Sequence, residues 1–148
     1  MIAIASDHRG YKIKEEIKKY FDENEIKYID FGTNSEESVD YPEEAKLVAL
    51  SIQNKECEKG VLICGTGLGM SIVANKFKGI RCAVCSNETT AKYSRLHNDS
   101  NILAIGASEV SSSEVISILK IWLETGFEGG RHAERLKLIE LLENENFK

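Results

Sequence analysis

Short runs of branched apolar residues alternate along the chain with segments in which apolar residues recur every three or four positions. The runs cover residues 2–5, 60–64, 80–85 and 102–105, with a weaker, half-polar run at 26–31. Uninterrupted apolar runs are typical of strands that are buried on both faces of a sheet. The half-polar run at 26–31 indicates a more peripheral strand.

The segments between these runs have the spacing of amphipathic helices. Ile13, Ile17 and Phe21 lie four residues apart and form one apolar stripe, the pattern of a helix that covers a core. Pro42 predicts where a second helix begins, because proline is favoured in the first helical turn. Residues 111–113 are three serines, which can cap a third helix.

The sequence Gly-Phe-Glu-Gly-Gly at 126–130 breaks the third helix, and a last helix is expected from about Arg131. Its apolar residues Leu136, Ile139 and Leu142 are expected to face inward. Strands that alternate with helices predict an α/β fold, a five-stranded parallel sheet with helices on both faces. With no repeat or linker, residues 1–148 are expected to form a single domain.

Charge and composition narrow the function. The 148 residues include 19 Lys plus Arg against 24 Asp plus Glu, a net charge of −5, which argues against a general binder of nucleic acids or membrane surfaces. No apolar run is long enough to span a membrane, and the N-terminus lacks the basic start of a signal peptide. A cytoplasmic location is expected, where the four cysteines would be reduced.

The order of strands and helices indicates where chemistry should occur. In open parallel sheets, ligands bind beyond the carboxyl ends of the strands, which selects residues 6–10, 32–41 and 64–69. In the third segment, the alternating Gly65, Gly67 and Gly69 can turn backbone N–H groups around an anion just before a helix. From spacing alone, a tight strand-to-helix turn that uses glycine for packing explains this pattern equally well.

Two hypotheses are open for Cys64 from its position alone. At a helix N-terminus the thiolate form of cysteine is favoured, so it could be a nucleophile or a general base. It could also be a small buried hydrophobe. Cys82 and Cys85 should point to opposite faces of a strand, so they cannot bind one ion and are interpreted as packing residues. Cys57 is assigned no role.

Histidine and arginine positions provide further candidates. His97 precedes the strand at 102–105, at the opposite edge of the sheet from Cys64, so within one chain it should lie far from the glycine loop. It is therefore either unrelated to that loop or delivered to a neighbour's site in an oligomer. Arg131 and Arg135 are one helical turn apart behind two glycines, an arrangement that suits a phosphate group or a solvated basic face.

Together these segments resemble the ribose-5-phosphate isomerase B type of the sugar-phosphate isomerase family, which includes the galactose-6-phosphate isomerase subunits. The resemblance covers nearly the whole chain. The matching segments are 6–8, 30–33, 39–42, 63–71, 74–76, 79–81, 94–99 and the Gly-Gly-Arg-His-x-x-Arg motif at 129–135.

The resemblance implies a Rossmann-like three-layer fold and a homodimer, or a dimer of dimers, whose active sites contain residues of both subunits. In such an assembly, the C-terminal helix from about residue 131 is expected to pack on a partner subunit. It implies reversible conversion of ribose 5-phosphate to ribulose 5-phosphate without metal or cofactor. Cys64 then moves a proton between C1 and C2, His97 opens the furanose ring, and Thr66 and Asp7 complete the catalytic set. The substrate-binding positions that it implies are Asp7, His8, Tyr41, Gly65, Thr66, Gly67, Leu68, Gly69, Asn98, Arg131 and Arg135.

One position departs from the family pattern. Many members carry a further phosphate-binding arginine where this chain has Ser108, followed by the acidic Glu109. Either Arg131 and Arg135 suffice, or phosphate binds more weakly, or Arg9 or Lys76 contributes. The departure also leaves room for a different sugar phosphate.

Three alternatives remain open at this stage. A hexose 6-phosphate isomerase acting on allose or galactose 6-phosphate would use the same scaffold. A non-catalytic phosphate-binding module would bind ligand without turnover. A redox protein would use Cys82 and Cys85, against which the strand geometry argues.

Overall fold

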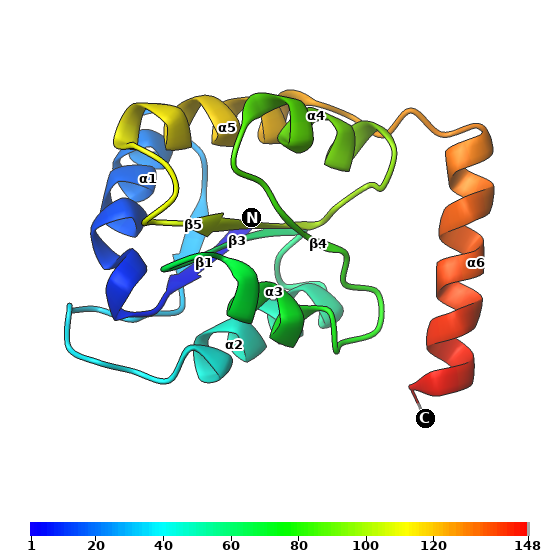
Figure 1. Cartoon of the computed structure of the whole chain (residues 1–148), viewed down its shortest axis with the longest axis horizontal. Coiled ribbons are helices and arrows are strands. Elements are labelled where there is room, and N and C mark those ends of the chain that lie inside the picture. Colours follow the sequence, from blue (N-terminus) through cyan, green and yellow to red (C-terminus); the bar gives the residue numbers. More distant parts are fainter. Residues whose placement is uncertain (148) are drawn as a thin grey trace.

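The computed structural model describes residues 1–147 and arranges them in three layers, with a parallel sheet between two layers of helices (Figure 1). The strands are β1 (Ile2–Ser6), β2 (Tyr28–Asp30), β3 (Lys59–Cys64), β4 (Cys82–Val84) and β5 (Ile102–Gly106). All neighbouring strands pair in parallel, in the order β2-β1-β3-β5-β4. The predicted α/β architecture with a five-stranded parallel sheet is confirmed.

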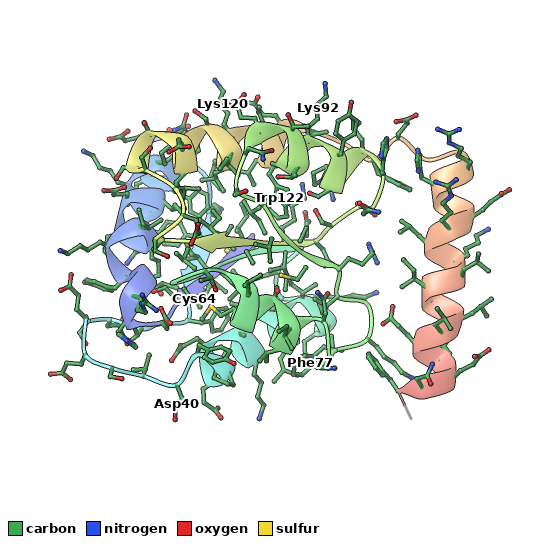
Figure 2. All side chains as sticks on the ribbon, viewed as in Figure 1. Asp40, Cys64, Phe77, Lys92, Lys120 and Trp122 are labelled. Carbon is green, nitrogen blue, oxygen red and sulfur yellow. The ribbon has the colours of Figure 1, made fainter. Side chains whose placement is uncertain are left out.

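Helices cover both faces of the sheet. On one face lie α1 (Tyr11–Glu23), α4 (Glu88–Leu96) and α5 (Ser112–Glu124), and on the other α2 (Tyr41–Gln53) and α3 (Leu68–Ala74) (Figure 1). The stripe of Ile13, Ile17 and Phe21 is buried in the first of two apolar clusters, as its spacing predicted. Trp122 of α5, which is fully buried, belongs to the same cluster (Figure 2).

The position of each strand in the sheet explains how completely its apolar residues are buried. Every residue of β1 and β5 is buried, whereas β2 and β4 are three-residue edge strands that are only partly covered. Cys82 packs against the cluster below the sheet and Cys85 belongs to the one above, so the two cysteines occupy opposite faces as predicted. Burial raises the pKa of both thiols, which keeps them protonated and inert.

The predicted helix starts are also observed. Pro42 lies in the first turn of α2. Ser111 caps α5 in a reciprocal arrangement: its hydroxyl accepts a hydrogen bond from the Glu114 amide, and the Glu114 carboxylate accepts one from the Ser111 amide. No helix within residues 1–147 combines the length and the hydropathy needed to cross a membrane.

The last helix, α6 (Arg131–Asn146), begins where it was expected but stands away from the sheet (Figure 1). The prediction that Leu136, Ile139 and Leu142 face inward is wrong for Ile139 and Leu142, whereas Leu136 is partly buried. Leu142 is 57% exposed and Ile139 is 42% exposed, and His132 is the buried residue of this helix. Helical spacing identifies an apolar face but not the surface that covers it. Within residues 1–147, this face is largely exposed.

Candidate active site

The carboxyl ends of β1 and β3 bring two of the predicted segments together. Ser6 pairs with Ile63 in the sheet, and a short 3₁₀ helix, η1 (His8–Gly10), follows β1. Gly10 leaves no room for a side chain, because a Cβ there would lie 2.5 Å from the carbonyl oxygen of Ile63. The turn after β1 therefore packs directly on β3, beside the start of the glycine loop (residues 65–69).

Cys64 ends β3 and is 6% exposed, between β3 and α3 (Figure 2). The amide of Gly67 donates a hydrogen bond to its Sγ atom over 3.1 Å. Gly67 has φ +82°, the left-handed conformation that glycine adopts without strain. The loop thus turns a backbone N–H back onto the sulfur, an arrangement that can stabilise negative charge there.

The segment after β5 fixes the glycine loop from its other side. The amide of Ala107 donates to the carbonyl oxygen of Cys64 over 2.7 Å, and the amide of Ser108 donates to that of Gly65 over 3.0 Å. The Ser108 hydroxyl donates to the same Gly65 oxygen. Ser108 therefore holds the backbone of the loop, where the family pattern has a phosphate-binding arginine.

Two side chains flank the glycine loop closely. A Cβ on Gly69 would lie 2.5 Å from the ring of Tyr41, and a Cβ on Gly65 would lie 2.8 Å from the guanidinium of Arg9. Tyr41 is thus beside the loop, as the resemblance implied. Arg9 provides a positive charge at the same place. The sequence alone suggests Arg9 only as a substitute for the missing arginine. Its place in the segment after β1, at the carboxyl end of a strand, is the pattern that predicts it near the site.

Asp7 and His8 organise the neighbouring loops. Asp7 is 6% exposed, and its Oδ1 accepts hydrogen bonds from the amides of Arg9 at 2.9 Å and Gly10 at 3.1 Å. His8 Nδ1 accepts a bond from the amide of Val39 at 3.2 Å, which ties the segment before α2 to the end of β1. Both residues lie at the same sheet edge as Cys64.

A buried ion network anchors the segment that leads to Tyr41. The ammonium of Lys14, whose side chain is fully buried, donates to Asp30 Oδ1 over 2.7 Å and to the carbonyl oxygen of Thr33. Lys18 donates to Asp30 Oδ2 over 2.9 Å. Partial burial opposes ionisation of Asp30, but the hydrogen bonds from Lys14 and Lys18 outweigh it, and the pKa of Asp30 falls below its ordinary value.

The remaining predicted residues form a second group. His97 caps the C-terminus of α4, and Asn98 follows it. Arg95, which is 6% exposed, donates to Asp99 Oδ1 at 2.8 Å, to the Ser100 carbonyl at 2.6 Å and to the Thr125 carbonyl at 3.0 Å. One buried guanidinium therefore ties the turn that carries His97 to the segment that leads into α6.

The start of α6 contacts His97 directly. The ring of His132 stacks on that of His97, with centroids 4.2 Å apart and planes 13° from parallel. Glu128 Oε2 lies 3.8 Å from His97 Nε2. Burial, together with the charges of His97 and the two arginines, lowers the pKa of His132. Arg131 and Arg135 are exposed on the first two turns of α6.

The two groups lie at opposite ends of the sheet. Cys64 pairs with Gly106 at the carboxyl end of β5, whereas His97 precedes Ile102 at the amino end of that strand. The expectation that His97 lies far from the glycine loop within one chain agrees with this topology. One chain therefore brings together Asp7, His8, Tyr41 and Cys64 with the glycine loop, and separately His97, Asn98, Arg131 and Arg135.

Residues that sequence reasoning missed cluster around His97. His132 and Glu128 were assigned no role, although His132 lies inside the Gly-Gly-Arg-His motif and Glu128 directly precedes it. Their proximity to a histidine in a different helix could not be read from their spacing. Arg95 was part of a matched segment, and its burial became visible only with the fold.

Comparison with known proteins agrees with the family resemblance seen in the sequence. Residues 2–139 match the family described as Ribose/Galactose Isomerase. The chain is similar to ribose-5-phosphate isomerase B of Escherichia coli, with 46% identity over 96% of this chain and 95% of the relative.

Two solved structures have the same fold. The structure of Clostridium thermocellum ribose-5-phosphate isomerase B has a TM-score of 0.96 and 48% identity, and the match covers 97% of each chain. That of Mycoplasma genitalium ribose-5-phosphate isomerase B, described with bound ribulose-5-phosphate, has a TM-score of 0.93 and 39% identity. The match covers 98% of this chain and 97% of the other.

Proposed function

Because this chain belongs to the ribose/galactose isomerase family, we propose that it is an aldose–ketose isomerase that interconverts ribose 5-phosphate and ribulose 5-phosphate. Within the site, one observation supports this function most directly. The thiol of Cys64 lies directly before the glycine loop, and the amide of Gly67 donates a hydrogen bond to its sulfur. The function also agrees with the ribulose-5-phosphate bound to the Mycoplasma genitalium relative.

Cys64 acts as the base in the proposed chemistry. As a thiolate it takes the proton from C2 of the open-chain aldose, which leaves an enediolate, and returns a proton to C1 to form the ketose. A positioned base contributes a rate factor of roughly 10²–10⁴. Thr66, two residues after Cys64, is exposed, and its Oγ1 accepts a hydrogen bond from the Leu68 amide, so its hydroxyl proton is available to a substrate oxygen.

The glycine loop stabilises the charge that develops on the substrate oxygen. Backbone N–H groups between Gly65 and Gly69 are held in place by the segment after β5, so they need no reorganisation during the reaction. Each such preorganised donor contributes a rate factor of about 10²–10³. Asp7 and His8 lie at the same edge and bind the sugar hydroxyls, together with Tyr41.

His97 opens the furanose ring, with Asn98 binding the sugar beside it. Since His97 and Cys64 lie at opposite ends of β5, the complete site contains Cys64 of one chain and His97 of a second copy. The chain is then one domain whose α6 packs on a partner, in a homodimer or a dimer of dimers. The exposed Leu138, Leu141 and Leu142 support this assembly, because such an apolar face is typical of an interface.

Arg131 and Arg135 bind the substrate phosphate through charge-assisted hydrogen bonds. Both are exposed near His97 and are free to face a partner's glycine loop. Arg9, which lies against Gly65, adds positive charge on the other side of the proposed site. The enzyme works in the cytoplasm without metal or cofactor.

The experiment that tests this function follows the reaction by proton NMR. Purified protein is incubated with ribose 5-phosphate in D₂O and EDTA. The proposal predicts ribulose 5-phosphate with deuterium at the exchanging carbon, because the enediolate accepts its proton from a base that exchanges with solvent. Absence of product from every sugar phosphate tested would favour a phosphate-binding module instead.

Ser108 favours one second candidate, a hexose 6-phosphate isomerase on the same scaffold. Serine is uncharged, and the hydroxyl of Ser108 is hydrogen-bonded to the carbonyl oxygen of Gly65. Ser108 therefore provides no positive charge for the phosphate. The family is described as Ribose/Galactose Isomerase, so its description covers a six-carbon sugar as well as ribose. Comparison of kcat/KM for ribose, allose and galactose phosphates separates the two candidates: a larger value for a six-carbon substrate supports the second.

A further inference from the structure

His97, Glu128 and His132 bring three metal-binding groups together. One ring nitrogen of each histidine and one carboxylate oxygen of Glu128 lie within 4.8 Å of one another. Two imidazoles and a carboxylate are the ligands of zinc sites that keep a fourth position open. Magnesium and calcium prefer oxygen ligands, so this set of donors selects zinc or a similar transition metal.

The burial of His132 is a second, independent observation. Its side chain is 4% exposed, and its Nε2 atom is buried without a hydrogen-bond partner among residues 1–147. Buried polar atoms nearly always have a partner. The ring of His132 stacks on that of His97, and one of its two ring nitrogens lies within 4.8 Å of the donor atoms of His97 and Glu128.

We propose that His97, His132 and Glu128 bind Zn²⁺ and that the bound ion inhibits the enzyme. The binding itself stands on the geometry of the three side chains. The inhibition rests on the proposed function, in which His97 opens the sugar ring. A ring nitrogen whose lone pair binds zinc can no longer accept a proton, so the ion removes His97 from that step.

The three side chains must rearrange to bind the ion. With ligand distances of about 2.0–2.2 Å, two ligands of a tetrahedral zinc lie about 3.4 Å apart. Glu128 is exposed on a segment that also contains Gly126, Gly129 and Gly130, so it can approach the histidines. His97 is also partly exposed. Its ring must rotate out of the stack so that both imidazoles point at one ion.

Neighbouring charges set the strength of binding. Arg131 directly precedes His132 and Arg135 follows it on the same helix, and both charges oppose a cation, whereas the carboxylate of Glu128 favours it. The site is therefore expected to bind zinc reversibly rather than to hold it as a permanent structural ion. Substrate, whose sugar ring His97 is proposed to open, should compete with the metal for that side chain.

The direct test measures Zn²⁺ binding by titration calorimetry on metal-free, reduced protein. Glu128→Gln and His132→Gln should each weaken binding at least about tenfold, because even outer-shell changes cost about 10–100-fold at metal sites. Glu134→Gln is the matched control, since Glu134 is an exposed carboxylate of the same helix outside the cluster. Unchanged zinc affinity in both Glu128→Gln and His132→Gln would overturn the proposed site.

Cobalt distinguishes this site from the four cysteines. Co²⁺ bound by thiolates gives intense near-ultraviolet charge-transfer bands, whereas nitrogen and oxygen ligands give only weak visible bands. The proposal predicts the weak bands alone, and their loss in Glu128→Gln. Because Glu128 is exposed, this variant is expected to fold even if His132→Gln does not. A thiolate spectrum that survives in Glu128→Gln would assign the metal to cysteine and overturn the proposal.

Activity tests the second half of the proposal. Zinc should inhibit the native enzyme and Glu134→Gln alike, EDTA should reverse the inhibition, and Glu128→Gln should need at least about tenfold more zinc. Zinc that binds at the cluster without inhibition would overturn the inhibitory role. If the protein isomerises no sugar phosphate, the calorimetric result still decides the metal site, so failure of the proposed function is distinguished from failure of this inference.

Discussion

The amide of Gly67 donates a hydrogen bond to the sulfur of Cys64 over 3.1 Å, which makes the first turn of the glycine loop part of the environment of the thiol. The segment after β5 fixes the loop: Ser108 donates hydrogen bonds to the carbonyl oxygen of Gly65, and Ala107 donates one to that of Cys64. The donors that face the proposed reaction are thus fixed before substrate arrives. Such preorganisation is the main source of electrostatic catalysis.

Replacement of Cys64 tests its role as base. Cys64→Ala should lower kcat by at least about 10²-fold, because the positioned base is lost. The measurement is the rate of ketose formation from ribose 5-phosphate at saturating substrate. The unfolding midpoint should change little, since the side chain is small. Cys82→Ala, a partly buried thiol outside the site, is the control and should retain activity. A near-normal kcat in Cys64→Ala would remove Cys64 from the chemistry.

Arg135 is expected to act on binding rather than on chemistry. Arg135→Ala should raise KM about tenfold or more with a small change in kcat, because a phosphate remote from the reacting carbons is bound similarly in ground and transition states. Steady-state kinetics separate the two parameters. Lys120→Ala removes an exposed cation from α5 and should change neither. An unchanged KM in Arg135→Ala would place the phosphate elsewhere, with Arg9 the next candidate.

A site shared between chains predicts complementation. Cys64→Ala and His97→Asn should each be inactive alone. When equal amounts are unfolded together and refolded, half of the dimers are mixed, and each mixed dimer has one site with both native residues. About one quarter of native activity should return. If the two residues belonged to one chain's site, no mixture would recover activity.

The pH dependence of stability should report the ion network of Asp30. Its pKa is lower in the folded chain than the ordinary 3.8, so its contribution is present above that value and is lost as pH falls through the folded pKa. Asp30→Asn should cost about 3 kcal/mol at pH 7, because it leaves the buried Lys14 unpaired. The difference from the native protein should shrink below about pH 4.

Urea unfolding at pH 3 to 7 measures this difference. Asp40→Asn is the matched control, because Asp40 is exposed and its side chain makes no capping hydrogen bond. Its effect should be within about 0.5 kcal/mol at each pH. A constant difference between the native protein and Asp30→Asn over this range would show that Asp30 does not carry the acid sensitivity.

Local patterns were sufficient to predict the sheet. The buried runs became β1, β3 and β5 because residues covered on both faces must be apolar throughout. The run at 80–85 became only the three-residue β4, since its position at an edge leaves Val84 partly exposed. The spacing of apolar residues in α6 predicted an apolar face but not which surface covers it, and a partner subunit was expected there only from the family resemblance.

The site was predictable to the extent that its residues follow strand ends. Cys64, Asp7 and Tyr41 lie where the carboxyl ends of parallel strands place them. The contact between His97 and His132 joins two helices that are far apart in sequence, so neither position indicates it. The role of Ser108 was equally hidden, because its bond to Gly65 depends on the register of β3 with β5.

The position of α6 away from the sheet has a consequence for how the stability of this protein depends on its concentration. In the proposed dimer, a helix whose leucines are exposed on its own chain gains most of its hydrophobic stabilisation from the second copy. Folding and association are then coupled, and the melting temperature should rise with protein concentration. Below the dissociation constant of the pair, the chain would lose the order of α6, and its proposed active sites would separate with it.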